Sequence, residues 1–166
     1  MRNYLSILLV VLFSMFVLTS CGPDEPGDGE EEITTVKLTF DNGVGTISWM
    51  VGDAKPSITL DANTTYTVSA EFLNETDPND VEDVTEEIKA EDDEHLVCYT
   101  IAGADFTVTR TDSDGALEVG LETSWVTGSA STGSLTLELR HQPGVKDGTC
   151  APGDSDVEVE FDITIQ

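Results

Sequence analysis

Basic residues are scarce in this chain of 166 residues, which has 7 Lys and Arg against 33 Asp and Glu and a formal charge of −26. A surface this negative repels phosphate backbones and anionic lipid surfaces, so nucleic acid is disfavoured as a partner. The same charge attracts cations. Solubility and repulsion between neighbouring molecules nevertheless account for it without any specific cation.

Recognisable catalytic motifs are also missing. The sequence has no Gly-x-Ser-x-Gly elbow and no Gly-rich phosphate loop, and its two histidines have no nucleophile partner at a known spacing. Close carboxylates such as Glu86 and Glu87 lie in a segment so acidic that any pair arises by chance. We therefore expect a protein that is not an enzyme.

Long hydrophobic runs are confined to the N-terminus, where residues 4–18 are apolar apart from two serines. This run has the length of the apolar region of a signal peptide and is short for a membrane span. It ends in Leu18-Thr19-Ser20-Cys21, which resembles the lipobox of bacterial lipoproteins, in which the cysteine receives a diacylglycerol. The resemblance implies a signal peptide over residues 1–20 and a lipid anchor on Cys21 that is effectively permanent.

The segment after this cysteine predicts a tether. Residues 22–32 contain only Gly, Pro, Asp and Glu, so they have no sizeable side chain to bury, and we assign residues 21–33 as a lipidated acidic tether. Acidic stretches directly after a lipid cysteine resemble the surface-export signals of Bacteroidetes lipoproteins. Gly22 also differs from the Asp that retains such proteins in the inner membrane. The expected location is the outer membrane, lipid-anchored and surface-exposed.

From Thr34 onward the dominant period is two, which is typical of strands with one buried face. Val36, Leu38 and Phe40 alternate with polar residues, and an Asp-Asn-Gly turn leads to a second alternating run over residues 47–51. Residues 34–166 therefore predict one antiparallel β-sandwich, immunoglobulin-like or related, with seven or eight strands. Further strands are expected over residues 66–72, 95–101, 105–111, 117–127, 134–141 and 157–165, with a short piece at 57–60 and a short acidic helix or loop within 80–94, capped by Asp83 or Thr85.

Both histidines fall in phase with predicted core-facing rows. His95 shares parity with Val97, and His141 shares it with Leu139. Counting strands as alternately up and down places the two imidazoles at the same pole of the sandwich. With the carboxylates that precede His95, they suit zinc or copper, and the candidate ligands are His95, His141, Glu91, Asp93 and Glu94. The alternative is a pair of strand-end histidines hydrogen-bonded to loop carbonyls.

Two cysteines remain after lipidation, Cys98 and Cys150, and no paired Cys-x-x-Cys spacing indicates a metal site. An envelope location permits them to form a disulfide, which would close a loop of about 50 residues. Two unrelated thiols are the alternative, because the sequence does not give the distance between them.

The segment Asp112-Ser113-Asp114-Gly115 has the opening pattern of many calcium loops. It lacks the later Glu at EF-hand spacing, so a hairpin turn is the better interpretation.

Several stretches resemble a group of small, uncharacterised Bacteroidetes lipoproteins, and together they span most of the mature chain: residues 33–40, 62–68, 71–75, 84–88 and 139–143. Such lipoproteins are often encoded beside TonB-dependent outer-membrane receptors. The resemblance therefore implies a non-catalytic binding or accessory module for nutrient or metal uptake with such a receptor. A structural or adhesive envelope lipoprotein that binds protein or glycan is the alternative. Val97-Cys98 departs from the aromatic residues expected there.

Overall fold

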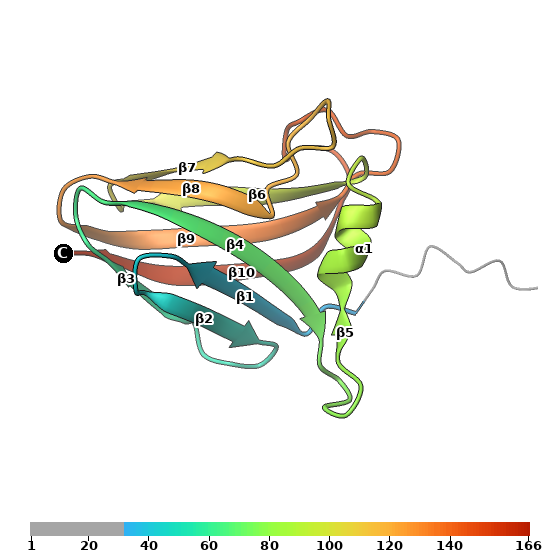
Figure 1. The fold of residues 1–166 in the computed structure, drawn as a ribbon, viewed down its shortest axis with the longest axis horizontal. Helices are drawn as coiled ribbons and strands as arrows, with labels where there is room; N and C mark the ends of the chain where they lie inside the picture. Colours follow the sequence, from blue (N-terminus) through green and yellow to red (C-terminus); the bar gives the residue numbers. More distant parts are fainter. Residues whose placement is uncertain (1–31) are drawn as a thin grey trace, which may run out of the picture.

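The computed structural model describes residues 32–166, which form two β-sheets packed face to face (Figure 1). The predicted signal peptide, Cys21 and most of the predicted tether lie outside the described residues. Within residues 32–166 no helix is both long enough and apolar enough to cross a membrane.

The larger sheet has six strands, and all its neighbouring strands pair antiparallel. Five of them follow the order β2-β1-β4-β8-β7, and β5 extends the sheet at the end of β4. Their bounds are β1 Thr35–Phe40, β2 Gly45–Met50, β4 Thr65–Asn74, β5 Glu82–Asp83, β7 Phe106–Arg110 and β8 Glu122–Thr127.

The smaller sheet has four strands in the order β3-β10-β9-β6. Strand β3 runs parallel to β10, whereas β10, β9 and β6 pair antiparallel. The bounds are β3 Ser57–Leu60, β6 His95–Ala102, β9 Ser131–His141 and β10 Asp154–Ile165, and the one helix of the described chain, α1, covers Val84–Ala90.

The core lies between the sheets and follows the predicted alternation. Val36 and Leu38 on β1 are fully buried, as are Leu135 and Leu137 on β9. At the centre the Trp125 indole is 0% exposed, so it serves packing rather than ligand binding. The predicted all-β sandwich is confirmed, and of the two alternatives for the acidic segment the structure has the helix. The described residues contain ten strands, where seven or eight were expected.

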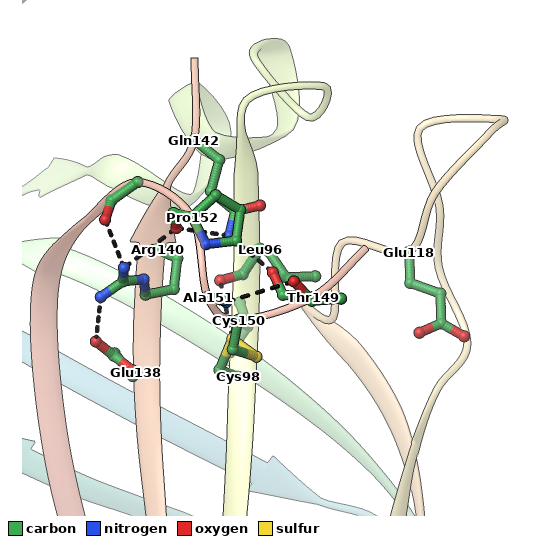
Figure 2. Close-up of a disulfide and its surroundings, with 12 residues drawn as sticks. Leu96, Cys98, Glu118, Glu138, Arg140, Gln142, Thr149, Cys150, Ala151 and Pro152 are labelled. Carbon is green, nitrogen blue, oxygen red and sulfur yellow. Dashed lines mark hydrogen bonds and ion pairs between the residues drawn. A yellow bond between two sulfur atoms is a disulfide. The ribbon is translucent and has the colours of Figure 1, made fainter. Parts of the chain in front are cut away.

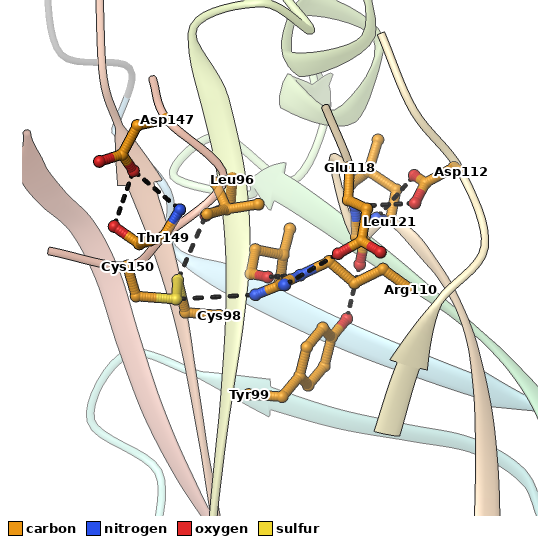
Figure 3. Close-up of polar contacts among 12 residues, drawn as sticks. Leu96, Cys98, Tyr99, Arg110, Asp112, Glu118, Leu121, Asp147, Thr149 and Cys150 are labelled. Carbon is orange, nitrogen blue, oxygen red and sulfur yellow. Dashed lines mark hydrogen bonds and ion pairs between the residues drawn. A yellow bond between two sulfur atoms is a disulfide. The ribbon is translucent and has the colours of Figure 1, made fainter. Parts of the chain in front are cut away.

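One predicted strand is shorter than expected. The run over residues 117–127 becomes strand only from Glu122, because the carboxylate of Asp112 accepts backbone hydrogen bonds from Gly120 at 2.7 Å, Leu121 at 2.8 Å and Glu122 at 3.2 Å (Figure 3). These bonds hold the preceding residues as a loop between β7 and β8. The two oxygens of Asp112 are thereby engaged, which supports the hairpin connection over a calcium loop.

Helix α1 is attached to the larger sheet at its first turn. The carboxylate of Asp83 accepts a hydrogen bond from the Thr85 backbone N–H at 3.1 Å, as predicted for the cap. The buried Thr85 hydroxyl accepts from the backbone N–H of Phe72 and donates to its carbonyl oxygen, at 2.9 and 3.2 Å. With Val84 and Ile88 buried, the helix lies across the end of the sandwich where the described chain begins (Figure 1).

Candidate metal site

The pairing of β6 with β9 brings the two histidines together. His95 is the first residue of β6 and His141 the last of β9, and the antiparallel register sets them directly opposite each other. Residues opposite each other in a ladder point to the same face of the sheet. Both belong to the core-facing row, at its open end, as the sequence predicted.

The two imidazole rings are stacked. Their centroids lie 4.8 Å apart and their planes differ by 10°. His95 is buried, with 8% of its surface exposed, whereas the side chain of His141 is 26% exposed. One ring therefore belongs to the wall of the core, and the other faces the solvent at the end of the sandwich.

Glu91 completes a group of three ligand-bearing side chains. It follows the last turn of α1, where its backbone N–H donates to the Glu87 carbonyl oxygen at 2.9 Å. One ligand atom from each of Glu91, His95 and His141 lies within 4.8 Å of the others. The helix, which its first turn attaches to β4, thus delivers a carboxylate to the pair of imidazoles.

The hydrogen bond of His95 defines which of its nitrogens is free. Nδ1 of His95 lies 3.0 Å from the carbonyl oxygen of Glu91. A carbonyl only accepts, so Nδ1 carries the proton and Nε2 keeps a lone pair. This is the usual arrangement of a metal-binding imidazole, in which the second nitrogen is held by a protein acceptor.

The other two predicted ligands take different positions. Glu94 lies beside the second ring, with Oε2 3.6 Å from Nε2 of His141, and its backbone carbonyl accepts from the Gln142 N–H at 2.6 Å. Asp93 is exposed and is not part of the three-residue cluster. The structure therefore brings together Glu91, His95 and His141, with Glu94 at the edge of the site.

The spacing of the three donors is wider than a bound ion requires. Zinc–nitrogen bonds of about 2.0–2.1 Å at a tetrahedral angle put two ligating nitrogens about 3.4 Å apart. The donors here are separated by up to 4.8 Å. The donors have to close by about 1.4 Å. Because an imidazole binds a metal in its own ring plane, one of the two nearly parallel rings also has to rotate. Glu91 is exposed and His141 partly so, and these two side chains therefore have room to move.

A disulfide joins Cys98 of β6 to Cys150, with Cα atoms 6.0 Å apart, so the pairing that the sequence left open is made (Figure 2). Leu96 and Cys98 have outward parity on the smaller sheet, yet both are buried. They are buried because residues 142–153, which connect β9 to β10, fold back over this face. The disulfide closes this loop beside the strand that carries His95.

Lys146, which the sequence analysis did not single out, braces the same end of the molecule. Its ammonium donates to the backbone oxygen of Asp92 at 2.6 Å and to Oδ2 of Asp114 at 2.9 Å. It thereby holds the turn between α1 and β6, which carries Glu91 and Glu94. In the sequence, the only indication of a structural role was that Lys146 is one of just seven basic residues and lies in a loop rich in Gly and Pro.

A hollow of about 200 Å³ lies against Tyr99 and Arg110. The polar contacts of these two residues are drawn in Figure 3. The Arg110 guanidinium is already engaged, because Nε donates to the Val97 oxygen at 2.8 Å, Nη1 contacts Glu118 at 3.3 Å and Nη2 lies 3.6 Å from the Cys150 sulfur. Burial raises the pKa of the Tyr99 phenol, whose hydroxyl donates to the Gly120 oxygen at 2.8 Å. The charged groups that line this hollow are therefore already paired with each other or with the protein backbone and are not available to a ligand.

No model of a known protein family matches the chain, and no curated protein matches it. The fold and the site together define the class: an acidic all-β sandwich with a His–His–Glu cluster at one end.

Proposed function

We propose that this protein binds a zinc or copper(II) ion through His95, His141 and Glu91, and that it does so as a lipid-anchored module of the cell envelope. The observation that carries the proposal is the cluster of two imidazoles and one carboxylate whose ligand atoms lie within 4.8 Å of one another. Two nitrogen donors and one oxygen donor match the preference of these borderline cations, whereas calcium and magnesium prefer oxygen donors alone.

The hydrogen bond of His95 and the contact of His141 with Glu94 support this proposal. With Nδ1 of His95 held by the Glu91 carbonyl, Nε2 is the ligand atom of that ring. Nε2 of His141 is turned towards Glu94, so Nδ1 is left for the metal and Glu94 orients the ring. We therefore assign Glu94 a positioning role and Asp93 none.

The envelope location rests on the sequence. A lipid on Cys21 would keep the domain at the outer membrane, and the strongly negative surface would concentrate cations around it. Together with the resemblance to lipoproteins encoded beside TonB-dependent receptors, these features support an accessory role in metal or nutrient uptake with such a receptor. Chemistry on a substrate is not part of the proposal.

Calorimetric titration of zinc and of copper(II) into residues 22–166, which lack the metal-binding thiol of Cys21, tests the proposal. We expect micromolar or tighter binding of one ion per chain, weakened about tenfold or more by His95→Gln, His141→Gln or Glu91→Gln. Asp93→Asn is the matched control, because it removes a neighbouring exposed carboxylate and should leave the affinity unchanged. Far-ultraviolet circular dichroism shows whether each variant retains the sheet.

The titration also separates the rival explanations. Weak binding of several ions, indifferent to both histidines, would show that the acidic surface only collects counterions. Absence of binding would leave the imidazole pair as a structural closure of the sandwich and redirect the search to protein and glycan partners.

A further inference from the structure

Strand β2 and the residues directly beside it form an uncharged stretch, residues 43–52, on a highly charged protein. Residues 43–52 contain no Asp, Glu, Lys or Arg, although 24% of the chain is charged. Met50 is 43% exposed and Val51 is 61% exposed. Trp49 packs against the core from the opposite face of β2 and is only partly buried at this edge of the sandwich. We call Trp49, Met50 and Val51 the β2 patch.

The β2 patch lies where the described chain enters the sandwich. The backbone N–H of Val51 donates to the Thr34 oxygen at 2.8 Å, and Met50 pairs with Thr35, the first residue of β1. Figure 1 shows the end of β2 and the start of β1 at the same end of the molecule, opposite the C-terminus. Any anchor that holds the segment before Thr34 therefore also keeps the β2 patch close to that anchor.

The length of that segment limits the distance between an anchor on Cys21 and the start of the sandwich at Thr34. Residues 22 to 33 separate Cys21 from Thr34, which is 33 − 21 = 12 residues. Even fully extended, this stretch reaches only about 45 Å. A domain of this size is itself about 35 Å across. A lipid on Cys21 therefore keeps the entry end of the sandwich within about one molecular diameter of the membrane.

We propose that Met50 and Val51, with Trp49 behind them, contact the lipid interface of the membrane that carries the anchor. This inference rests on the lipid anchor proposed above and is independent of the metal site. Two aliphatic side chains bind a bilayer weakly by themselves, but tethering converts the contact into an intramolecular event at high effective concentration. Residues 43–52 carry no charge of their own. The nearest carboxylate, Asp53, accepts a hydrogen bond from the Met50 backbone N–H at 3.2 Å, so the contact has to be shallow enough to leave Asp53 hydrated.

The depth of the contact is limited by the backbone. Strand β2 is the last strand of its sheet, so one side of its peptide groups is not bonded to another described strand. Such groups cannot enter hydrocarbon without a large cost. The contact therefore stops at the interfacial layer, where Trp side chains are enriched.

The two tryptophans make this contact measurable. Because Cys98 and Cys150 are joined, Cys21 is the one free thiol of the chain from Cys21 onward. It can be coupled to a maleimide lipid in phosphatidylcholine vesicles, which tests the contact without relying on processing in the cell. Trp emission is then compared in plain vesicles and in vesicles whose acyl chains carry bromine near the headgroup.

We expect bromine to quench part of the emission of the tethered wild type. The variant Trp49→Phe, which leaves only the core Trp125, should show no bromine effect. Val51→Glu should abolish most of the quenching, whereas Val145→Glu, a matched change at a residue 54% exposed in the loop 142–153, should preserve it. Bromine near the end of the acyl chain should quench less than bromine near the headgroup.

Equal emission in plain and brominated vesicles would overturn the proposal. So would a shift in Trp49 emission that depends on protein density and not on bromine, because it would indicate pairing between copies of the chain through β2. Mass spectrometry of the protein from its host tests the anchor separately. An unmodified Cys21 there would remove the membrane setting and refute the contact in the cell, whatever the vesicles show.

Discussion

The Nζ atom of Lys146 lies 2.9 Å from Oδ2 of Asp114, and the two side chains are only 3% and 7% exposed. This ion pair links the loop 142–153 to the loop between β7 and β8. The second hydrogen bond of Lys146, to the Asp92 oxygen, reaches the turn that carries Glu91. Removing one partner would leave a buried charge unpaired, which is costly. The pair therefore holds together the segments around the candidate metal site.

Asp114→Asn should destabilise the protein near neutral pH and have no effect in strong acid. Backbone N–H groups of Leu117 and Ala116, with Lys146, lower the pKa of Asp114 to about 2. The unfolded value is about 3.9. A lowered pKa stabilises the folded state above the unfolded value, and this contribution is lost as pH falls from about 4 to about 2.

Urea unfolding midpoints of both proteins across this pH range check the prediction. Asp93→Asn, which removes an exposed carboxylate outside these contacts, is the control. A difference between wild type and Asp114→Asn that stays constant with pH would show that lost packing, and not the charge, explains the change.

Replacing the disulfide cysteines, as Cys98→Ala with Cys150→Ser, should lower the free energy of unfolding by about 4 kcal/mol. The two residues are 52 apart, and the chain-entropy model assigns this magnitude to a loop of that length. Denaturant unfolding of the oxidised wild type and the double variant measures it. Two reactive thiols besides Cys21 in the unreduced wild type would contradict the premise.

Thr85→Val should cost about 1–3 kcal/mol of stability, because the backbone N–H and carbonyl of Phe72 would lose their buried partner. Thr85→Ser keeps the hydroxyl and should recover most of the loss. Thermal unfolding compares the two variants. Since Thr85 also attaches α1 to β4, Thr85→Val should weaken zinc binding through Glu91, and unchanged affinity would show that the helix is positioned by other contacts.

Metal should stabilise the folded protein and chelation should reverse the effect. At a free concentration one hundred times the dissociation constant, a single site adds about 2.7 kcal/mol to the free energy of unfolding. Chemical denaturation with zinc, and then with a chelator, checks this in wild type and in His141→Gln. The variant should respond to neither addition. An equal response in both proteins would place the stabilising ion elsewhere.

Much of the candidate site could be anticipated from the period of the strands. His95 and His141 have the parity of Val97 and Leu139, and parity alone puts both rings on the core face. Which carboxylate joins them could not be chosen among Glu91, Asp93 and Glu94. That choice depends on where α1 ends and on the hydrogen bond between the Glu91 carbonyl oxygen and His95. Both depend on how the helix packs against the sheets, which the sequence does not state.

The sequence by itself determined the all-β class and the core-facing side of most strands, because alternation of apolar and polar residues is a local property. It did not reveal that residues 117–121 form a loop or that Leu96 and Cys98 are covered on the outer face. It also determined the acidic composition and limited the cap of the acidic segment to Asp83 or Thr85. Only the tertiary structure decided the order of the strands, the pairing of His95 opposite His141, the disulfide between Cys98 and Cys150, and the contacts of Lys146. Each of these depends on which distant segments become neighbours, and that is set by the packing of two whole sheets against each other.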